Sequence, residues 1–354
     1  MIKISLKIIL GIIILILTVV AAYLAFMTIT DYKPEAVISL DIDNNKEKKV
    51  SVKDTMAVTT YNMGYAGMDK DVDFFMDGGT MSRSISKEKT LENLEGTLDI
   101  IKKEDPDFVF MQEVDRNSSR SYKIDQYEAL KEEFKDYSLS FAINYKTPWV
   151  PVPLTNPHGK VLAGLVNMSK FNIESSTRYD LPGKEPWPVQ LAELDRSISV
   201  SRFNTDNNKE LVMINAHLSA YDKGGNIRKQ QLGFLNDFLT KEYEKGNYVI
   251  IGGDWNHQIP GTDPTIFETT QEWPEWLQVI PDTFMPKGFS WQFDKNVPTA
   301  RSVDKPYKNG DNFRAVIDGF MVSDNVQVIE TKGRDLDFRY SDHNPVTLKF
   351  KLED

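Results

Sequence analysis

The longest apolar run of the chain lies within its first thirty residues. Residues 8–29 are apolar apart from two threonines, a length sufficient to cross a hydrocarbon layer of about 30 Å as a helix. Lysines precede the run at positions 3 and 7, and acidic residues crowd its far side. The positive-inside rule then places the N-terminus in the cytoplasm. We predict a single-pass transmembrane signal-anchor over residues 1–30, with the remainder outside the cell membrane. A cleaved signal peptide, and thus a secreted protein, is the alternative.

The pattern changes twice after this run. Residues 31–54 are polar and rich in lysine and acidic side chains, which predicts a linker. Over residues 55–354 short β-rich runs alternate with helical periodicity, which predicts one mixed α/β domain. Apolar residues spaced three to four apart predict amphipathic helices over 86–103 and 225–243. Strands are predicted at 56–62, 107–112, 138–144, 161–167, 195–203, 210–217, 247–252, 315–322 and 345–352.

Two irregular segments interrupt this alternation. The first, 145–159, is rich in proline, and we interpret its part from Pro148 to Pro153 either as a lid over a substrate or as a rigid loop. The second, 257–313, carries Trp273, Trp276 and Trp291. These tryptophans indicate the packing of an inserted subdomain, and an aromatic surface for lipid or sugar is the alternative.

Four polar residues stand at the ends of predicted strands. Asn62, Glu113, His217 and Asp254 each lie at or just after the last residue of an apolar β run. Binding sites are commonly assembled where strands end at one edge of a sheet. The pattern therefore predicts a polar site at such an edge.

Composition narrows the chemistry. The chain has 354 residues with 40% hydrophobic and 27% charged side chains, as in an ordinary globular protein. Its formal net charge of −10 argues against a nonspecific binder of nucleic acid, which needs a basic surface to displace counterions from phosphates. The chain contains no cysteine. This excludes disulfides, thiol nucleophiles and thiolate zinc sites.

Six short segments carry most of these polar residues, in a fixed order along the chain. They are Thr60-Tyr-Asn62, Met111-Gln-Glu-Val114, Asn215-Ala-His-Leu218, Gly252-Gly-Asp-Trp-Asn256, Ile317-Asp-Gly-Phe320 and Ser341-Asp-His-Asn-Pro345. Together they resemble the signature blocks of the endonuclease/exonuclease/phosphatase superfamily, which includes DNase I, neutral sphingomyelinases and inositol-phosphate phosphatases. One such block is weak evidence, whereas six in family order are specific. The resemblance implies a four-layered α/β/β/α sandwich of the DNase I type, preceded here by the transmembrane helix.

Hydrolysis of a phosphate ester needs an activated water and neutralised charge on the phosphoryl oxygens. Glu113 is a hard oxygen ligand suited to Mg²⁺, with Mn²⁺ as the alternative cation. The resemblance implies that Asp342 helps to organise this metal and the ring of His343. Whether one or two metal ions bind is left open.

The resemblance also implies a set of catalytic residues. Asp254 would position or activate the water, and His343 would accept a proton or stabilise charge at the phosphate. Which of these two is the general base stays open. His217 would contact the phosphate, and Asp318 would hold its tautomer through the other ring nitrogen.

Three further residues are predicted to bind phosphate oxygens. The resemblance implies this role for Asn62, Asn256 and Arg196. The remaining histidines, His158 and His257, lie outside the six segments. We therefore predict structural or surface roles for them.

The sequence thus predicts a monomeric, metal-dependent phosphoric ester hydrolase, either a phosphodiesterase or a phosphatase. Its substrate would be a small-molecule or lipid phosphate ester outside the membrane. The alternative is a surface DNase-type endonuclease, for which nucleic acid would be the partner. That function predicts a basic rim, but only scattered lysines are present. A catalytically dead binding module is less favoured because it has no use for a metal carboxylate and a base together.

Overall fold

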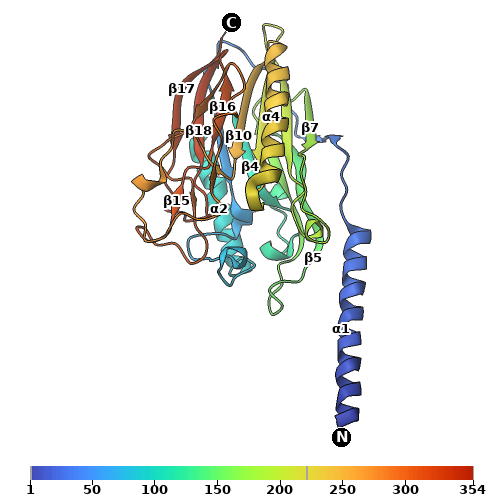
Figure 1. Ribbon diagram of the computed structural model, residues 1–354. Coiled ribbons are helices and arrows are strands. Elements are labelled where there is room, and N and C mark those ends of the chain that lie inside the picture. Colours follow the sequence, from blue (N-terminus) through green and yellow to red (C-terminus); the bar gives the residue numbers. More distant parts are fainter. Residues whose placement is uncertain (1, 221, 354) are drawn as a thin grey trace.

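Two seven-stranded sheets stacked face to face form the body of the protein in the computed structural model, which describes residues 2–220 and 222–353 (Figure 1). Met1 of the predicted signal-anchor, and Tyr221 and Asp354 of the predicted domain, lie outside the described residues. The first sheet has the order β1 (Val37–Ser39), β7 (Ser175–Asp180), β8 (Ser197–Asn204), β9 (Glu210–His217), β10 (Tyr248–Asp254), β16 (Asp318–Ser323) and β13 (Phe289–Gln292). The second has the order β17 (Val326–Gly333), β18 (Val346–Leu352), β3 (Met56–Asn62), β4 (Phe108–Asp115), β6 (Gly159–Ser169), β5 (Ser138–Val150) and β2 (Ile42–Asp43).

Side chains that alternate along the strands build the core on both faces of each sheet. In β10, Ile250 packs between the sheets with Phe110 and Leu348. Its neighbours Val249 and Ile251 point to the other face. This is the period of two that a strand buried on both faces requires.

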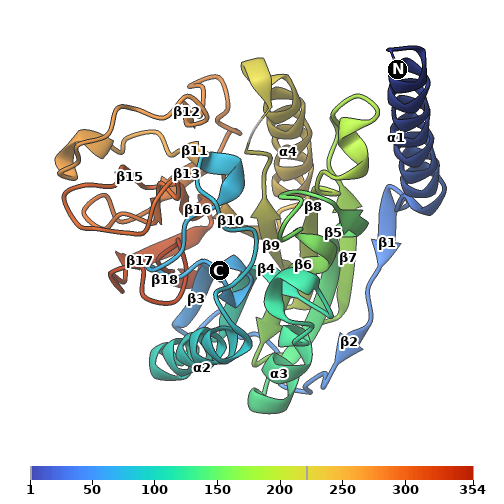
Figure 2. The same cartoon turned by 90° about the horizontal axis from the view of Figure 1, so that it is seen from below.

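Helices cover the two outer faces of the sandwich (Figure 2). Leu235 packs a long helix onto the first sheet, while Leu94 and Leu130 pack two helices onto the second. The four layers therefore follow the order α/β/β/α, which confirms the predicted fold class. The helices are α4 (Asn226–Glu244), α2 (Lys87–Glu104) and α3 (Gln126–Glu133).

Short elements complete the chain. Single 3₁₀ turns span Gly64–Ala66, Phe75–Asp77, Ser119–Ser121, Val189–Leu191, Lys223–Gly225 and Pro264–Ile266. Two small ribbons pair β11 (His257–Gln258) with β12 (Gln278–Val279) and β14 (Ala300–Arg301) with β15 (Arg314–Ala315). β11, β12 and β14 lie in the segment predicted as irregular, and β15 directly follows it.

Two of the three tryptophans of that segment pack inside it. Trp276 packs against the cluster that contains Phe313, and the Trp273 ring lies 5.7 Å from the same phenylalanine. Trp291, on β13, instead packs against the core of the first sheet, where its ring lies 4.7 Å from that of Trp255 between centroids.

The predicted linker is part of both sheets instead of a free tether. β1 pairs with β7, and β2 pairs with β5. Val50 and Val52 are buried between the sheets. The sequence did not reveal these strands because each is two or three residues long and most of their neighbours are polar. β7 and β17 were missed for a similar reason, since both are rich in polar side chains.

The proline-rich segment 145–159 extends a hairpin. β5 continues to Val150 and β6 begins at Gly159, so only the tip between them is irregular. The hairpin lies on the side of the sandwich next to α1 (Figure 1).

α1 (Ile2–Thr30) extends away from the sandwich, opposite to the end where the chain finishes (Figure 1). Among the described residues, its part from Leu6 to Thr30 is the one helix long and apolar enough to cross a membrane.

Candidate active site

Three of the predicted residues stand in a row across the first sheet. In the register of β9, β10 and β16, Asp254 pairs with His217 on one side and with Asp318 on the other. Two strand spacings, about 9–10 Å, therefore separate His217 from Asp318. The register of the sheet alone places Asp254 at the centre of the row.

The second sheet brings two more residues to Asp254. Asn62, the last residue of β3, donates from Nδ2 to Asp254 Oδ2 at 3.0 Å. His343, just before β18, places Nε2 3.7 Å from the same oxygen, and His217 places Nε2 3.4 Å from it. All four residues are buried. One carboxylate oxygen is thus surrounded by polar groups from both sheets.

Asp318 orients His343 and not His217. His343 Nδ1 donates to Asp318 Oδ2 at 2.8 Å, whereas His217 Nδ1 has no hydrogen-bond partner among the described residues. The predicted pairing of Asp318 with His217 is wrong, because β10 runs between them. The ring of His343 is also organised by Asp318 and not by Asp342, whose Oδ1 accepts a hydrogen bond from Ser341 Oγ at 3.3 Å.

The two histidines of the row experience opposite electrostatic environments. Burial lowers the pKa of His217 well below its usual value, and the charge of Arg196 lowers it further. Burial also acts to lower the pKa of His343, but Asp318 and Asp254 outweigh this effect and raise it well above the usual value. The surroundings therefore favour the neutral form of His217 and the charged form of His343.

Glu113 reaches the site from a bulge in β4. The register of β4 against β6 shifts between Met111 and Val114, and Glu113 has a φ of 57°. This left-handed conformation is uncommon outside glycine, and bulges of this kind redirect a side chain. Glu113 Oε1 lies 3.4 Å from Asn62 Nδ2. The bulge therefore joins Glu113 to the group around Asp254.

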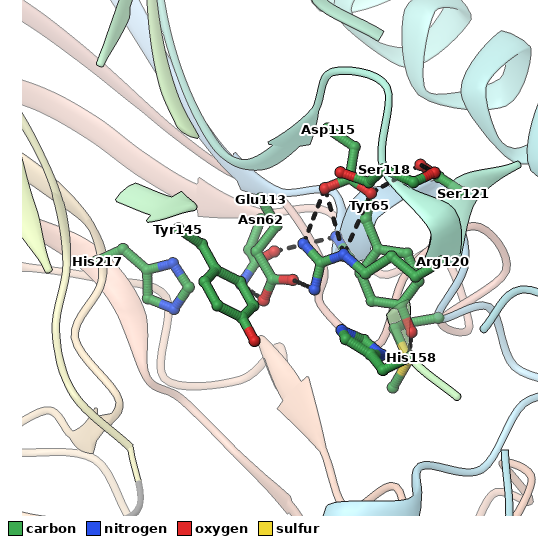
Figure 3. A network of polar contacts seen from close by, with 12 residues as sticks. Asn62, Tyr65, Glu113, Asp115, Ser118, Arg120, Ser121, Tyr145, His158 and His217 are labelled. Carbon is green, nitrogen blue, oxygen red and sulfur yellow. Dashed lines mark hydrogen bonds and ion pairs between the residues drawn. The ribbon is translucent and has the colours of Figure 1, made fainter. Parts of the chain in front are cut away.

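Arg120 supports Glu113 from behind, and the sequence did not predict it (Figure 3). Its Nη2 donates to Asp115 Oδ1 at 2.9 Å, and its Nη1 lies 3.5 Å from Glu113 Oε2. The guanidinium also lies 4.0 Å from the centroid of the Tyr65 ring. Because Arg120 and Asp115 are buried, this network fixes the carboxylate of Glu113. Two charged residues after a strand are usually solvated, so no signal in the sequence identified them.

The donor set of the site fits a hard divalent cation. Glu113 and Asp342 both line the cleft described below. Burial raises the pKa of Glu113, and the nearby charge of Asp342 raises it too. Two close carboxylates with room for water molecules suit Mg²⁺ or Mn²⁺. A second group, Asp254, Asp318 and His343, has possible ligand atoms within 4.8 Å of one another, but the His343–Asp318 hydrogen bond already uses one of them.

A glycine precedes Asp254 because a side chain does not fit there. Gly253 has a φ of 142°, and a Cβ placed on it would lie 1.9 Å from the carbonyl oxygen of Ala216. Only glycine combines this conformation with so close an approach of β9. The direction in which Asp254 leaves β10 depends on this residue.

These groups form the floor of a cleft of about 750 Å³, a usual size for a small-molecule site. Seven of the nine predicted site residues line it, whereas Asn62 and Asp318 are buried behind them. Arg196 also lines the cleft. Its charge partly offsets the rise that burial causes in the pKa of Glu113. Asn256 also lines it, and its Nδ2 donates to the Leu218 carbonyl at 2.8 Å.

One wall of the cleft is aromatic, whereas charged residues such as Lys33, Lys184 and Glu185 line other parts of it. Tyr65, Phe74 and Phe75 line one side and contact the ring of His158. His158 is buried, and its Nδ1 lies 2.6 Å from the Ser82 carbonyl oxygen. It therefore packs in the wall, apart from the group around the aspartate on the floor.

His257 also lies outside the floor of the cleft. It is buried, and its Nδ1 lies 2.6 Å from the Trp255 carbonyl oxygen. Burial lowers its pKa to about 4. Its position matches the structural role predicted for it.

Several solved structures have a fold similar to that of this chain. An endonuclease/exonuclease/phosphatase from Beutenbergia cavernae superposes with a TM-score of 0.55 at 18% identity, over 84% of this chain and 72% of that chain. The human Nocturnin catalytic domain with bound sulfate anion gives 0.54 at 16% identity, over 88% and 97%. Truncated TDP2 from Caenorhabditis elegans gives 0.51 at 16% identity, over 84% and 97%. These likenesses establish the DNase I-like fold.

Sequence comparison identifies the family. No curated protein matches the chain. The model of the Endonuclease/Exonuclease/phosphatase family matches residues 60–343, well over half of the chain and a range that includes the first five signature segments and the sixth as far as His343. The protein belongs to the endonuclease/exonuclease/phosphatase family.

Proposed function

We propose that this chain is a Mg²⁺-dependent phosphoric ester hydrolase, with Mn²⁺ as a substitute cation, that acts outside the membrane on a small-molecule or lipid phosphate ester. The observation that carries the proposal is the convergence on Asp254. Asn62, His343 and His217 lie within 3.7 Å of one of its carboxylate oxygens. Residues this far apart in the sequence, buried at the floor of one cleft, serve a common chemistry.

Asp254 takes the proton of the attacking water in this proposal. Burial raises the pKa of Asp254, which brings the carboxylate nearer to the basicity that a general base needs at neutral pH. The hydrogen bond from Asn62 holds the carboxylate in place.

His343 stabilises negative charge on a phosphoryl oxygen. Asp318 keeps its ring positively charged and oriented through Nδ1, so Nε2 is left to face the cleft. His217, Asn256 and Arg196 line the same cleft and bind the remaining phosphate oxygens. A charge placed before the reaction begins stabilises the transition state without reorganisation.

Glu113 and Asp342 would hold the divalent cation. When bound there, the cation neutralises charge on the phosphate and helps to activate water. Arg120 and Asp115 keep Glu113 in position through the buried network shown in Figure 3.

A substrate screen of the full chain in detergent micelles tests the proposal. The panel is a bis-aryl phosphate, sphingomyelin, sugar phosphates and plasmid DNA, each with Mg²⁺ and with EDTA. We expect hydrolysis of a small or lipid ester that EDTA abolishes and that Asp254→Asn lowers by about 10²–10⁴-fold. Asp237→Asn, an exposed change on α4, is the matched control and should retain full activity.

Three outcomes would contradict the proposal. Cleavage of DNA alone would indicate a surface endonuclease. Activity that persists in EDTA would contradict the metal dependence. Wild-type rates for Asp254→Asn would contradict the central role assigned to Asp254.

A further inference from the structure

The last two turns of α1 pack against the domain. Met27 is only 1% exposed. The Trp187 indole Nε1 donates to Thr28 Oγ1 at 3.2 Å, and the Tyr23 hydroxyl donates to the Trp149 carbonyl at 3.0 Å. These contacts fasten the helix to the β5–β6 hairpin, which carries Trp149 at the end of β5, and to the loop that carries Trp187. They fix how the domain is positioned along the helix.

The β5–β6 hairpin and the loop that carries Trp187 both contribute residues to the cleft. Val150 and Val152 of the hairpin and Val189 of the loop line it. So do Tyr32 and Lys33, which directly follow the helix. The mouth of the cleft therefore opens next to the point where the helix meets the domain.

The tip of the β5–β6 hairpin lies alongside the helix. Tyr23 precedes Thr30 by seven residues, which is about 10 Å along the axis of an α-helix. Trp149 contacts the helix at this level, and Figure 1 shows the hairpin between β5 and β6 hanging beside the upper part of α1. If α1 crosses a bilayer with Thr30 at its surface, the hairpin tip lies below that surface.

The tip has the composition of a segment that enters lipid. Residues 147–157 contain no charged side chain and four prolines. Leu154 is 87% exposed, and Trp149, Val152, Trp187 and Val189 are exposed as well. Tryptophan favours the boundary between lipid and water. Proline has no backbone N–H, so each one removes a donor that would lack a partner in hydrocarbon.

We propose that segments 149–154 and 187–189 enter the outer leaflet of the membrane that α1 spans. The cleft then takes its substrate, a lipid phosphate ester, from that same leaflet. The insertion of the two segments, the docking half of the proposal, is argued from the geometry of α1 and its contacts. The uptake of a lipid substrate, the substrate half, rests on the proposed function. Val150, Val152 and Val189 line the cleft at this rim, and their apolar side chains suit a lipid whose tails stay in the bilayer.

A depth measurement tests the docking half without any activity. Because the chain has no cysteine, Leu154→Cys provides a single site for a nitroxide label in the full chain, reconstituted in phosphatidylcholine vesicles. We expect the label to collide with lipid-soluble oxygen far more than with an aqueous nickel chelate. Ile329→Cys is the matched control, since it is 49% exposed on β17 at the sheet edge away from α1. Equal access of the nickel chelate to both labels would overturn the docking.

An activity comparison tests the substrate half. In vesicles that contain sphingomyelin and phosphatidylglycerol, Leu154→Asp should lower lipid hydrolysis by about tenfold or more, because a carboxylate in lipid is unfavourable. Hydrolysis of a water-soluble bis-aryl phosphate should stay unchanged, and Ile329→Asp should affect neither substrate. Unchanged lipid hydrolysis by Leu154→Asp would overturn the proposal. A wild-type chain that hydrolyses neither substrate would overturn the proposed function and the substrate half, while the depth measurement would still decide the docking.

Discussion

The floor of the cleft and its rim are built in different ways. The floor consists of buried polar residues at strand ends, and pairing partners in the sheets determine where each one stands. The rim consists of exposed apolar residues on loops and of the segment that follows α1. Asp254 on the floor has hydrogen bonds or close polar contacts on several sides, whereas Leu154 on the rim is almost fully exposed.

This difference separates the reaction from the choice of substrate. A change on the floor should reduce hydrolysis of every phosphate ester, because every ester presents the same phosphorus. A change on the rim or the walls should affect only esters that use that surface. Substitutions on the floor, behind it and on the wall therefore test whether reaction and choice of substrate are separate.

The largest effect is expected for His343→Ala. Loss of the charged ring should lower kcat by at least about 10²–10⁴-fold on soluble and lipid esters alike. The change also leaves the buried carboxylates of Asp318 and Asp254 without their cation, so the thermal unfolding midpoint should fall as well. Steady-state kinetics on two esters, with a thermal melt, measure this. A loss confined to one ester would break the division.

Gly253→Ala should also impair every substrate. The added Cβ would meet the Ala216 carbonyl, so the strand end must shift and Asp254 with it. We expect kcat to fall by about 10²-fold, the effect of a misplacement of about 1 Å. Gly246→Ala is the control, because it also replaces a glycine with positive φ but has open space around it. Equal, full activity in both variants would show that the close approach does not matter.

Asp318→Asn should have a smaller effect that appears in kcat. An amide cannot favour the charged form of His343 as a carboxylate does. The amide oxygen can still accept the hydrogen bond from Nδ1, but without a charge. We expect kcat to fall by about 10- to 100-fold with KM nearly unchanged, as for a group that acts in the transition state. An equivalent rise in KM alone would assign Asp318 to substrate binding.

Arg120→Lys should weaken the response to Mg²⁺. Lysine keeps the charge but cannot form the forked contact with Asp115 or stack on Tyr65 in the same way. The concentration of Mg²⁺ for half-maximal activity should rise by about tenfold, as for other residues that orient a metal ligand. An unchanged Mg²⁺ requirement would show that Glu113 needs no support from behind.

The smallest effect is expected on the wall. Phe75→Ala removes part of an aromatic surface that lines the cleft. It should raise KM for an ester with an apolar group by about 10-fold and leave kcat unchanged. For sugar phosphates KM should not change. A fall in kcat on all substrates would show that Phe75 contributes to the reaction itself, as the residues of the floor do.

The sequence predicted the floor far better than the rim. Strands with a regular apolar pattern end at Asn62, His217 and Asp254, so their polar ends were visible before the structure. The partner of His343 was not predictable, because the register that places Asp318 opposite Asp254 is a property of strand pairing. Sequence order alone could not separate the two histidines that Asp318 might orient.

The rest was hidden for physical reasons. Arg120 and Asp115 are charged residues that usually lie in water, and only the folded chain shows them buried together. The strands β1 and β2 are too short for any periodicity. The position of the 145–159 hairpin beside α1 depends on contacts across more than 120 residues of sequence, which no local pattern records.

A double-mutant cycle between the two sheets tests the central claim most directly. Glu113→Gln changes the second sheet and Asp254→Asn changes the first, and kcat for a bis-aryl phosphate is measured for both single variants and the double variant. If both residues act on one phosphorus, each single change is severe and the double variant loses little more than the worse single one. Losses that multiply in the double variant, or a single variant with wild-type kcat, would contradict a shared site.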